Sequence, residues 1–273
     1  MKIAALSDMH GNDAALDAVL ADIDKQGADH ILILGDMIAD FPHTVKTILQ
    51  TVRGLPAHVI RGNREGYLIK NAAGEYGDDW EKYDQFETSR QIYRQLDPND
   101  LAYLRALPVQ MAFEFDGLSI RMVHGSPFSE RDEIREGADD LIARSLAAIP
   151  EKILLCGHAH QPMIKRIGEK TAVNVGSAGG NFDGDSHAQY TIIESDGGNI
   201  RIGMRKTPYD FAAFKATYDM ESIWERLCIK GIEDGVNCVV MFFEEAQKRC
   251  DDWPIPNEIW NGLAAEWAAK GKL

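Results

Sequence analysis

Three short apolar runs, separated by segments with a helical pattern, most limit the folds open to this chain of 273 residues. The runs cover residues 2–7, 30–34 and 57–60. After the first run, apolar residues recur every three to four positions from Leu16 to Ile23, and a similar pattern spans 44–52, as in amphipathic helices. Continuously apolar strands that alternate with helices indicate a parallel sheet buried on both faces.

The second half of the chain adds more strand patterns. Two of them flank Asp116-Gly117, a dipeptide that favours a tight hairpin turn. The expected elements are strands at 111–115, 118–123, 152–156, about 171–175, 188–194 and 199–205, with a helix at 138–149. We therefore expect an α/β fold, which some schemes would class as α+β.

Two helical segments extend this framework. Residues 66–107 predict a helical insertion, in which aromatic residues from Trp80 to Tyr93 suit one helix with a wide aromatic face. Asp97-Pro98 predicts the start of a further helix, because aspartate caps helices and proline suits their first turn. Residues 207–273 predict a helical C-terminal extension. Packing onto the core is the simpler interpretation of this extension, and a docking or homo-oligomer surface is the alternative.

Composition limits the partners of the chain. Hydrophobic residues make up 45% of the sequence and charged residues 26%, which suits a globular protein with a full core. The net charge of −14 opposes broad attraction to a nucleic-acid backbone, so we do not expect a nucleic-acid partner. A phosphate substrate stays open, because a bound metal can reverse the sign of the field locally.

Signals for the membrane or for secretion are missing from the pattern. No window approaches the roughly 18 apolar residues of a transmembrane helix. A secretory signal is not expected, because Asp8 interrupts the first apolar run too early. The four cysteines show no CxxC spacing and indicate reduced thiols. We therefore expect a cytoplasmic location and no membrane partner.

Residues able to bind a metal follow the predicted strands where each strand ends. Asp8 and His10 come after the first strand, two positions apart, which puts both side chains on one side of an extended chain. The other residues of this kind are Asp36, Asn63, His124, His158 and His160. Ligands of open α/β sheets bind outside the carboxyl ends of the strands, so we expect the seven side chains to converge.

The size of this set points to two metal ions. A lone histidine is more often structural than a ligand, but a structural explanation would have to account for each strand end separately. Two carboxylates, one amide oxygen and four imidazoles suit two ions about 3.5–4 Å apart that share a carboxylate, and the central Asp36 is the natural bridge. Nitrogen and oxygen ligands without thiolates favour Mn, Fe, Zn, Ni or Co over Ca and Mg.

In this order, the motifs resemble those of the calcineurin-like metallophosphoesterase superfamily. The motifs that carry the resemblance are Asp8-x-His10, Gly35-Asp36, Gly62-Asn63, His124 and Gly157-His158-x-His160, over about residues 1–195. The stretch from Asn174 to Gly179 is similar to a turn in the bacterial and archaeal small phosphodiesterase branch. Val175 stands where that branch usually has proline.

The resemblance implies a fold and a set of metal ligands. The fold would be a two-sheet β-sandwich flanked by helices, with residues 1–206 as the metallophosphoesterase domain. One metal would be bound by Asp8, His10, Asp36 and His160, and the other by Asp36, Asn63, His124 and His158.

Arg64 departs from the pattern of many members, which have a histidine thought to protonate the leaving group at this position. A guanidinium stays protonated near neutral pH, so Arg64 cannot serve as that acid, although it can clamp a phosphate oxygen. The alternative is a structural salt bridge with Glu65 or with an acid of the insertion. A helix is expected to begin at Asn12 or Asp13 and to end at Gly27, and the positive end of this helix beside Asn12 would favour a substrate phosphate.

These observations lead to a hypothesis of function. Two divalent ions, with Mn the most promising in vitro, would generate a bridging hydroxide that hydrolyses a phosphate ester, preferentially a phosphodiester. Asn63 would stabilise charge, His10 could contact the leaving group, and Arg64 and Asn12 would bind substrate. The alternatives are a nucleotide or dinucleoside polyphosphate hydrolase, a protein phosphatase, and a non-catalytic interaction scaffold.

Overall fold

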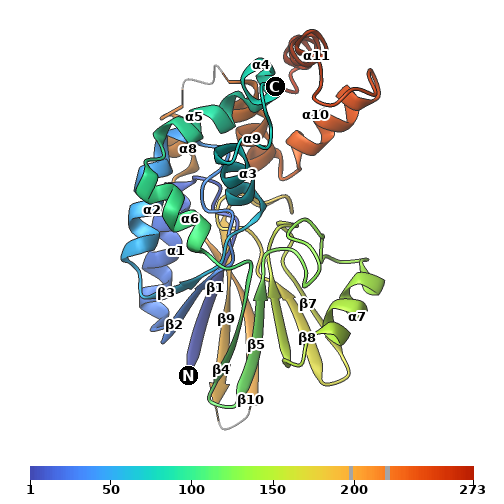
Figure 1. Ribbon diagram of the computed structural model, residues 1–273. Helices are drawn as coiled ribbons and strands as arrows, with labels where there is room; N and C mark the ends of the chain where they lie inside the picture. Colours follow the sequence, from blue (N-terminus) through green and yellow to red (C-terminus); the bar gives the residue numbers. More distant parts are fainter. Residues whose placement is uncertain (197–198, 219–221) are drawn as a thin grey trace.

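Two five-stranded sheets face each other and helices cover their outer faces (Figure 1). This computed structural model describes residues 1–196, 199–218 and 222–273. Residues 197–198 and 219–221 fall within the predicted ranges 1–206 and 207–273 but lie outside the described residues. The arrangement confirms the predicted two-sheet sandwich.

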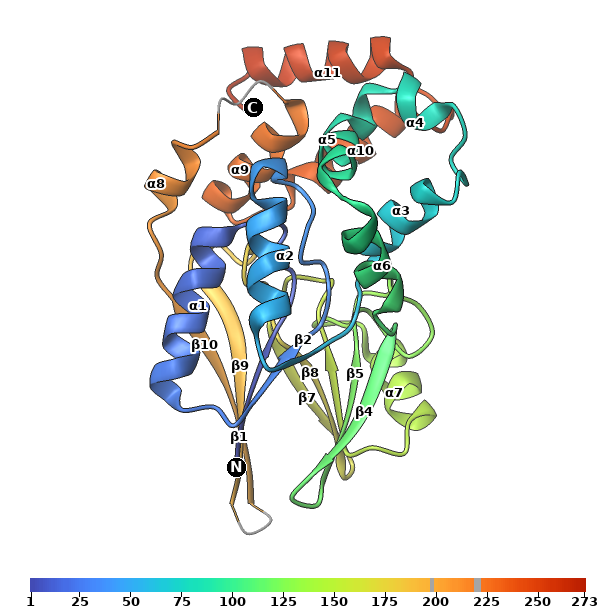
Figure 2. The same cartoon turned by 60° about the vertical axis from the view of Figure 1, so that its left-hand side comes forward.

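The first sheet has the strand order β10-β9-β1-β2-β3. Its strands are β1 (Lys2–Leu6), β2 (His30–Ile33), β3 (Ala57–Val59), β9 (Ala188–Asp196) and β10 (Asn199–Thr207). β1, β2 and β3 run parallel, whereas β9 pairs antiparallel with both β1 and β10. The helices α1 (Asp13–Gln26) and α2 (Val45–Gly54) cover its outer face (Figure 2).

The second sheet has the order β4-β5-β6-β8-β7. Its strands are β4 (Gln110–Phe115), β5 (Leu118–Val123), β6 (Ile153–Cys156), β7 (Met163–Ile167) and β8 (Lys170–Asn174), and α7 (Asp139–Ala148) packs on its outer face. The sequence prediction missed β7. Among the described strands, β8 alone pairs with β7, which is therefore an edge strand. Most side chains of β7 are at least partly exposed, so β7 lacks the apolar run of a central strand.

Successive side chains of β1 point to opposite faces of the first sheet, and those that point inward pack against the second sheet. Ile3 and Ala5 of β1 face the interior of the sandwich, whereas Ala4 and Leu6 face the helices. Ile120 of β5 lies in the same interior cluster as Ile3. Because both faces of β1 are buried, its sequence is continuously apolar.

The insertion forms several short helices instead of one long aromatic helix. Its elements are α3 (Asn63–Ala72), α4 (Asp79–Lys82), the 3-10 turn η2 (Asp84–Phe86), α5 (Glu87–Gln95) and α6 (Pro98–Ala106). The prediction of one helix from Trp80 to Tyr93 was wrong, because the backbone is extended at Tyr83. The aromatic residues do pack together, since Trp80 stacks between Tyr76 and Phe86. Asp97 caps α6 as predicted.

The C-terminal helices pack against this insertion above the carboxyl ends of the strands (Figure 2). They are α8 (Phe211–Lys215), α9 (Ile223–Asp234), α10 (Cys238–Gln247) and α11 (Asn257–Ala269). Asn257 accepts a hydrogen bond from the Asp84 backbone, and Gln85 accepts one from Ile255. Within the described ranges, no helix is long and apolar enough to cross a membrane.

Candidate metal centre

The seven residues predicted as ligands lie together at the carboxyl ends of the strands. Asp8 and His10 follow β1, Asp36 follows β2, and Asn63 is the first residue of α3 after β3. His124 follows β5, while His158 and His160 follow β6. All are buried except His158, which is partly exposed. Both sheets therefore deliver side chains to one point.

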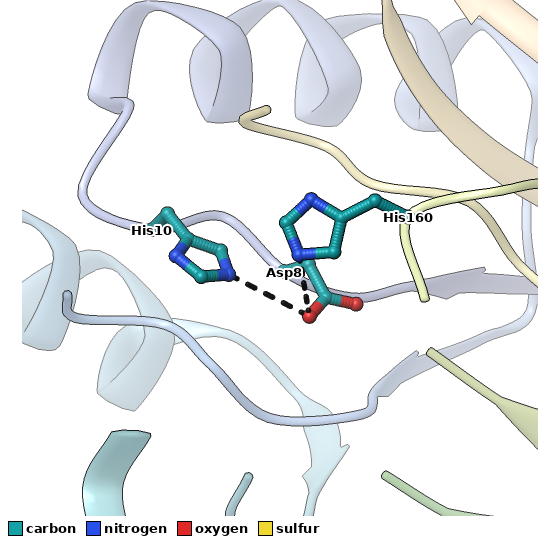
Figure 3. A group of neighbouring side chains, drawn as sticks. All are labelled: Asp8, His10 and His160. Carbon is teal, nitrogen blue, oxygen red and sulfur yellow. Dashed lines mark ion pairs between the residues drawn. The ribbon is translucent and has the colours of Figure 1, made fainter. Parts of the chain in front are cut away.

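Two groups of potential metal ligands can be distinguished. The first contains Asp8, His10 and His160, whose donor atoms lie within 4.8 Å of one another. The Nε2 atoms of His160 and His10 lie 3.3 and 3.6 Å from the same oxygen of Asp8, Oδ1 (Figure 3). Two imidazole nitrogens therefore point at one carboxylate oxygen.

The second group contains Asp36, His124 and His158. His124 Nε2 lies 3.3 Å from Asp36 Oδ2 and 3.0 Å from Asn63 Oδ1. The same Asp36 oxygen lies 3.6 Å from His10 Nε2 in the first group. Asp36 thus links the second group to the first, as its predicted bridging role requires. That bridging role remains a prediction.

Hydrogen bonds at the rear of the imidazoles turn their Nε2 atoms toward this centre. The Nδ1 atoms of His10, His124 and His160 contact Asp40 Oδ2, the Leu34 carbonyl oxygen and the Gly180 carbonyl oxygen, respectively. Such outer contacts orient the histidine ligands of metal sites.

Two of the atoms that face the centre have charged neighbours but make no hydrogen bond in the described structure. His10 Nε2 and Asp8 Oδ1 are buried and make no hydrogen bond within the described structure. A buried polar atom without a partner is costly, and a divalent cation between these groups would satisfy both of them. The residues present therefore fit a transition-metal pair.

The backbone at the centre adopts a conformation that is rare outside glycine. Asp8, His10, Asp36, His158 and His160 all have φ between 49° and 64°. Left-handed backbone at such residues costs about 1–3 kcal/mol each and clusters at functional sites. Among the described non-glycine residues with positive φ, only Asp116, in the β4–β5 hairpin, lies elsewhere.

Comparison with known proteins agrees with this geometry. The calcineurin-like phosphoesterase superfamily domain matches residues 1–198. The chain belongs to the calcineurin-like phosphoesterase superfamily. It is 23% identical over 245 residues to the uncharacterized protein MJ0912 of Methanocaldococcus jannaschii, a match that covers 82% of this chain and 91% of that relative.

Two crystal structures resemble the fold over nearly their whole length. The hypothetical protein PH1004 of Pyrococcus horikoshii superposes with a TM-score of 0.73 at 20% identity, covering 86% of this chain and 98% of that chain. A metallophosphoesterase of Sphaerobacter thermophilus superposes with a TM-score of 0.69 at 25% identity, covering 86% and 100%. Both cover more of this chain than residues 1–198 alone, so the likeness extends into the C-terminal helices.

The charges of this candidate site favour protonated imidazoles when metal is absent. Burial would lower the pKa of His10 and of His124, but nearby carboxylates outweigh it and raise each pKa from 6.5 to about 10. Burial would raise the pKa of Asp36, yet the neighbouring imidazoles hold it at about 2. Protons on the two histidines therefore take the place of metal charge.

Asp40 is a residue that sequence reasoning missed. One carboxylate oxygen, Oδ2, lies 2.7 Å from His10 Nδ1. The other, Oδ1, accepts hydrogen bonds from Arg64 Nη2 at 3.1 Å and from Trp224 Nε1 at 2.8 Å. No local pattern singles out Asp40, because its three partners come from distant parts of the chain.

The predicted structural salt bridge of Arg64 has a different partner in the structure. Arg64 pairs with Asp40, which follows β2, and not with Glu65 or an acid of the insertion. The guanidinium carbon lies 5.1 Å from the centre of the Trp224 ring, and the Arg64 backbone amide donates to Asp36 Oδ1 at 2.8 Å. Arg64 also lines a cavity beside the candidate metal centre, so the predicted contact between Arg64 and a substrate stays a prediction.

Glu65 has a structural role that the sequence did not predict. It is fully buried and accepts hydrogen bonds from the backbone amides of Asp36, Met37, Ile38 and Gly62 at 2.8 to 3.2 Å. One carboxylate thereby ties the loop after β2 to the loop after β3. This contact sets the position of Asp36 relative to Asn63.

Asn12, one of the two residues predicted as the cap, is the N-cap of α1 and is fully buried. Its side-chain oxygen accepts a hydrogen bond from Ala15, and its amide donates to the Gly179 carbonyl and to the Tyr209 hydroxyl. These contacts join α1 to the loop that follows β8. Direct binding of substrate by the Asn12 side chain remains a prediction, and would require it to leave one of these partners.

Proposed function

We propose that this protein is a metal-dependent phosphoric ester hydrolase, with phosphodiesters as its preferred substrates. The observation that carries the proposal is the pair of ligand groups that meet at Asp36, in which the buried atoms His10 Nε2 and Asp8 Oδ1 make no hydrogen bond in the described structure. Membership of the phosphoesterase superfamily and the likeness to a protein named metallophosphoesterase support it.

The metals would contribute the chemistry that side chains cannot. The seven residues would hold two divalent ions, which would supply Lewis acidity and would lower the pKa of water to about 7, so that a nucleophile would be available at neutral pH. We propose Mn²⁺ as the first ion to test, because the nitrogen and oxygen ligands suit it among other transition metals.

The residues of the chain would orient the reacting groups. Asp40 holds the His10 ring through Nδ1, and Asn63 presents its amide beside His124. Arg64 lies at the edge of the cavity, where its guanidinium can contact a phosphate oxygen. Because a guanidinium is a poor acid, substrates with good leaving groups should react fastest.

The predicted contact between His10 and the leaving group remains a proposal with a condition. His10 Nδ1 contacts Asp40, and His10 Nε2 faces Asp8 and Asp36. Protonation of a leaving group by His10 would require one of these nitrogens to be released. A role in holding metal needs no such change.

Further proposals concern the location, the substrate and the association state of the protein. We propose a cytoplasmic location, a small phosphate ester or nucleotide as substrate, and association of two copies through the helical regions as an arrangement to examine. A protein phosphatase, a polyphosphate hydrolase and a non-catalytic scaffold stay as rivals.

Hydrolysis assays decide between these functions. The purified protein is assayed for metal content and for hydrolysis of a bis-aryl phosphodiester and an aryl monoester, with and without Mn²⁺. Faster turnover of the diester supports the proposal, whereas faster turnover of the monoester favours a phosphatase. No turnover with any metal would favour the scaffold. Asp36→Asn and His158→Ala should each abolish metal-dependent turnover.

A further inference from the structure

A cavity of about 280 Å³ opens beside the metal centre and has two unlike sides. One side consists of residues of the centre, among them His10, Asp36 and His158. The other side, here called the apolar wall, is formed by α9, α10 and the turn between them. The residues of the apolar wall are Leu227, Cys228, Ile232, Cys238, Val239 and Val240. The polar Asn237 of the turn also lines the cavity, and its side-chain oxygen accepts a hydrogen bond from the Val240 backbone.

The apolar wall is held in place relative to the metal centre. Trp224, at the start of α9, donates a hydrogen bond to Asp40, and its ring packs against Arg64. Cys228 and Ile232 belong to a buried cluster that includes Phe41 of the loop after β2. The wall and the candidate ligands therefore form one cavity with a defined shape.

The wall carries no charge of its own. Burial raises the pKa of the Cys228 thiol and of the Cys238 thiol, so both stay neutral near neutral pH. Among the described residues that line the cavity, Arg64 is the only arginine or lysine, and Asp40 already pairs with it. Glu133 also lines the cavity, and its carboxylate pairs with Arg135 at 2.9 Å, so it offers no attraction to further negative charge on a ligand.

We propose that the apolar wall binds an uncharged apolar ester group of the substrate, such as a phenyl or short alkyl group. This inference rests on the proposed phosphodiesterase function and adds a substrate class to it. Burial of the ester group against the wall would favour such diesters, because removal of apolar surface from water is favourable. Polyphosphates would be disfavoured, since their extra phosphates would lie against this uncharged surface without a cation.

A second cavity beside Asn63 is the alternative binding place for the ester group. It lies on the other side of Asn63, has a volume of about 450 Å³, and is lined by Lys70, Ser126 and Arg131. Within the described parts of the chain, neither Lys70 nor Arg131 forms an ion pair. A polar ester group would prefer this cavity to the apolar wall.

Diesters with a constant leaving group test the proposal. All release 4-nitrophenolate in the presence of Mn²⁺, while the second ester group is phenyl, methyl or thymidine-5′-yl. The phenyl diester should have the highest kcat/KM, above the methyl and thymidine diesters by about five- to tenfold. Binding of phenylphosphonate and methylphosphonate, measured by calorimetry, should show a preference in the same direction.

Two neighbouring positions of α10 provide a matched pair of variants. Val240 and Met241 are 45% and 48% exposed, but only Val240 lines the cavity. Val240→Lys should lower kcat/KM for the phenyl diester and phenylphosphonate affinity by about fivefold, because it places an ammonium on the wall. Met241→Lys adds the same charge outside the cavity and should change either value by less than about twofold.

The outcomes separate this inference from the proposed function. Equal kcat/KM for all three diesters, or equal effects of Val240→Lys and Met241→Lys, would overturn the inference while the hydrolase function stands. A preference for the thymidine diester that Arg131→Gln abolishes would overturn it in favour of the second cavity. If no diester is hydrolysed with any metal, the proposed function fails, and the phosphonate affinities alone then decide whether the wall binds apolar groups.

Discussion

Trp224 donates a hydrogen bond from its indole Nε1 to Asp40 Oδ1 at 2.8 Å, although 184 positions separate the two residues in the sequence. The other oxygen of Asp40 contacts His10 Nδ1 at 2.7 Å. One carboxylate therefore links the C-terminal helices to the candidate metal centre. The C-terminal extension thus contributes to the site through Asp40 and through the apolar wall, although it holds none of the predicted ligands.

Replacement of Asp40 by asparagine should weaken metal binding. Asp40→Asn keeps the shape of the side chain but removes the charge that orients and polarises the His10 ring, and loss of such an outer partner lowers metal affinity by about 10- to 100-fold. Calorimetric titration with Mn²⁺ measures the effect. Trp224→Phe is the matched control, because it removes one hydrogen bond to Asp40 and retains a ring beside Arg64. Equal metal affinity in Asp40→Asn and the wild type would contradict the orienting role.

Metal binding should tighten as pH rises and should release protons. Without metal, the pKa values of His10 and His124 are both raised from 6.5 to about 10, so these imidazoles carry protons at neutral pH that a metal must displace. Stability of the metal-free protein depends on pH in the opposite direction. The two protonated histidines contribute fully to stability below pH 6.5, and that contribution is lost as pH rises through about 10.

Titration calorimetry in buffers of different ionisation enthalpy measures these protons. At neutral pH, we expect the observed binding enthalpy to depend on the buffer, and we expect Mn²⁺ affinity to increase from pH 6 to pH 8 by about tenfold or more. A binding enthalpy independent of the buffer would show that the histidines are already deprotonated in the metal-free protein.

Loss of the Glu65 charge should destabilise the fold and disturb the site. Glu65 accepts four backbone hydrogen bonds, and Glu65→Gln replaces one acceptor oxygen by an NH₂ group that cannot accept them. We expect the free energy of unfolding to fall by about 2–3 kcal/mol. Urea unfolding measures this change, and Glu75→Gln, at an exposed position of the insertion, serves as the control. Equal unfolding midpoints for the two variants would rule out the structural role of Glu65.

Glycine at position 62 should be required for metal binding, whereas glycine at position 66 should not. A Cβ atom on Gly62 would lie 2.2 Å from Asp36 Oδ1, so Gly62→Ala must displace the central carboxylate. Gly66 lies within α3 with no atom close to an added Cβ, so Gly66→Ala should raise stability by up to about 1 kcal/mol. Metal titration and thermal unfolding of both variants check this. Metal binding by Gly62→Ala as strong as that of the wild type would contradict the close approach of the two loops.

Local patterns predicted many of the elements, because backbone geometry repeats over a few residues. A helix was predicted to begin at Asn12 or Asp13 and to end at Gly27, and Asn12 and Gly27 are the N-cap and C-cap of α1. By contrast, the strand Met163–Ile167 and the extended backbone at Tyr83 were missed. The edge strand β7 forms by pairing with β8, which its own sequence does not show. The aromatic residues around Tyr83 pack as one cluster but belong to more than one helix.

The sequence alone determined which residues face the candidate metal centre. Each predicted ligand follows a strand, and parallel strands bring their carboxyl ends to one place, so Asp8, Asp36 and His124 could be grouped without a structure. Only the tertiary structure decided what surrounds them: the Asp40 carboxylate, the Glu65 hydrogen bonds and the apolar wall. These contacts join segments far apart in the chain. They depend on how the insertion and the C-terminal helices pack, and no local spacing records that packing.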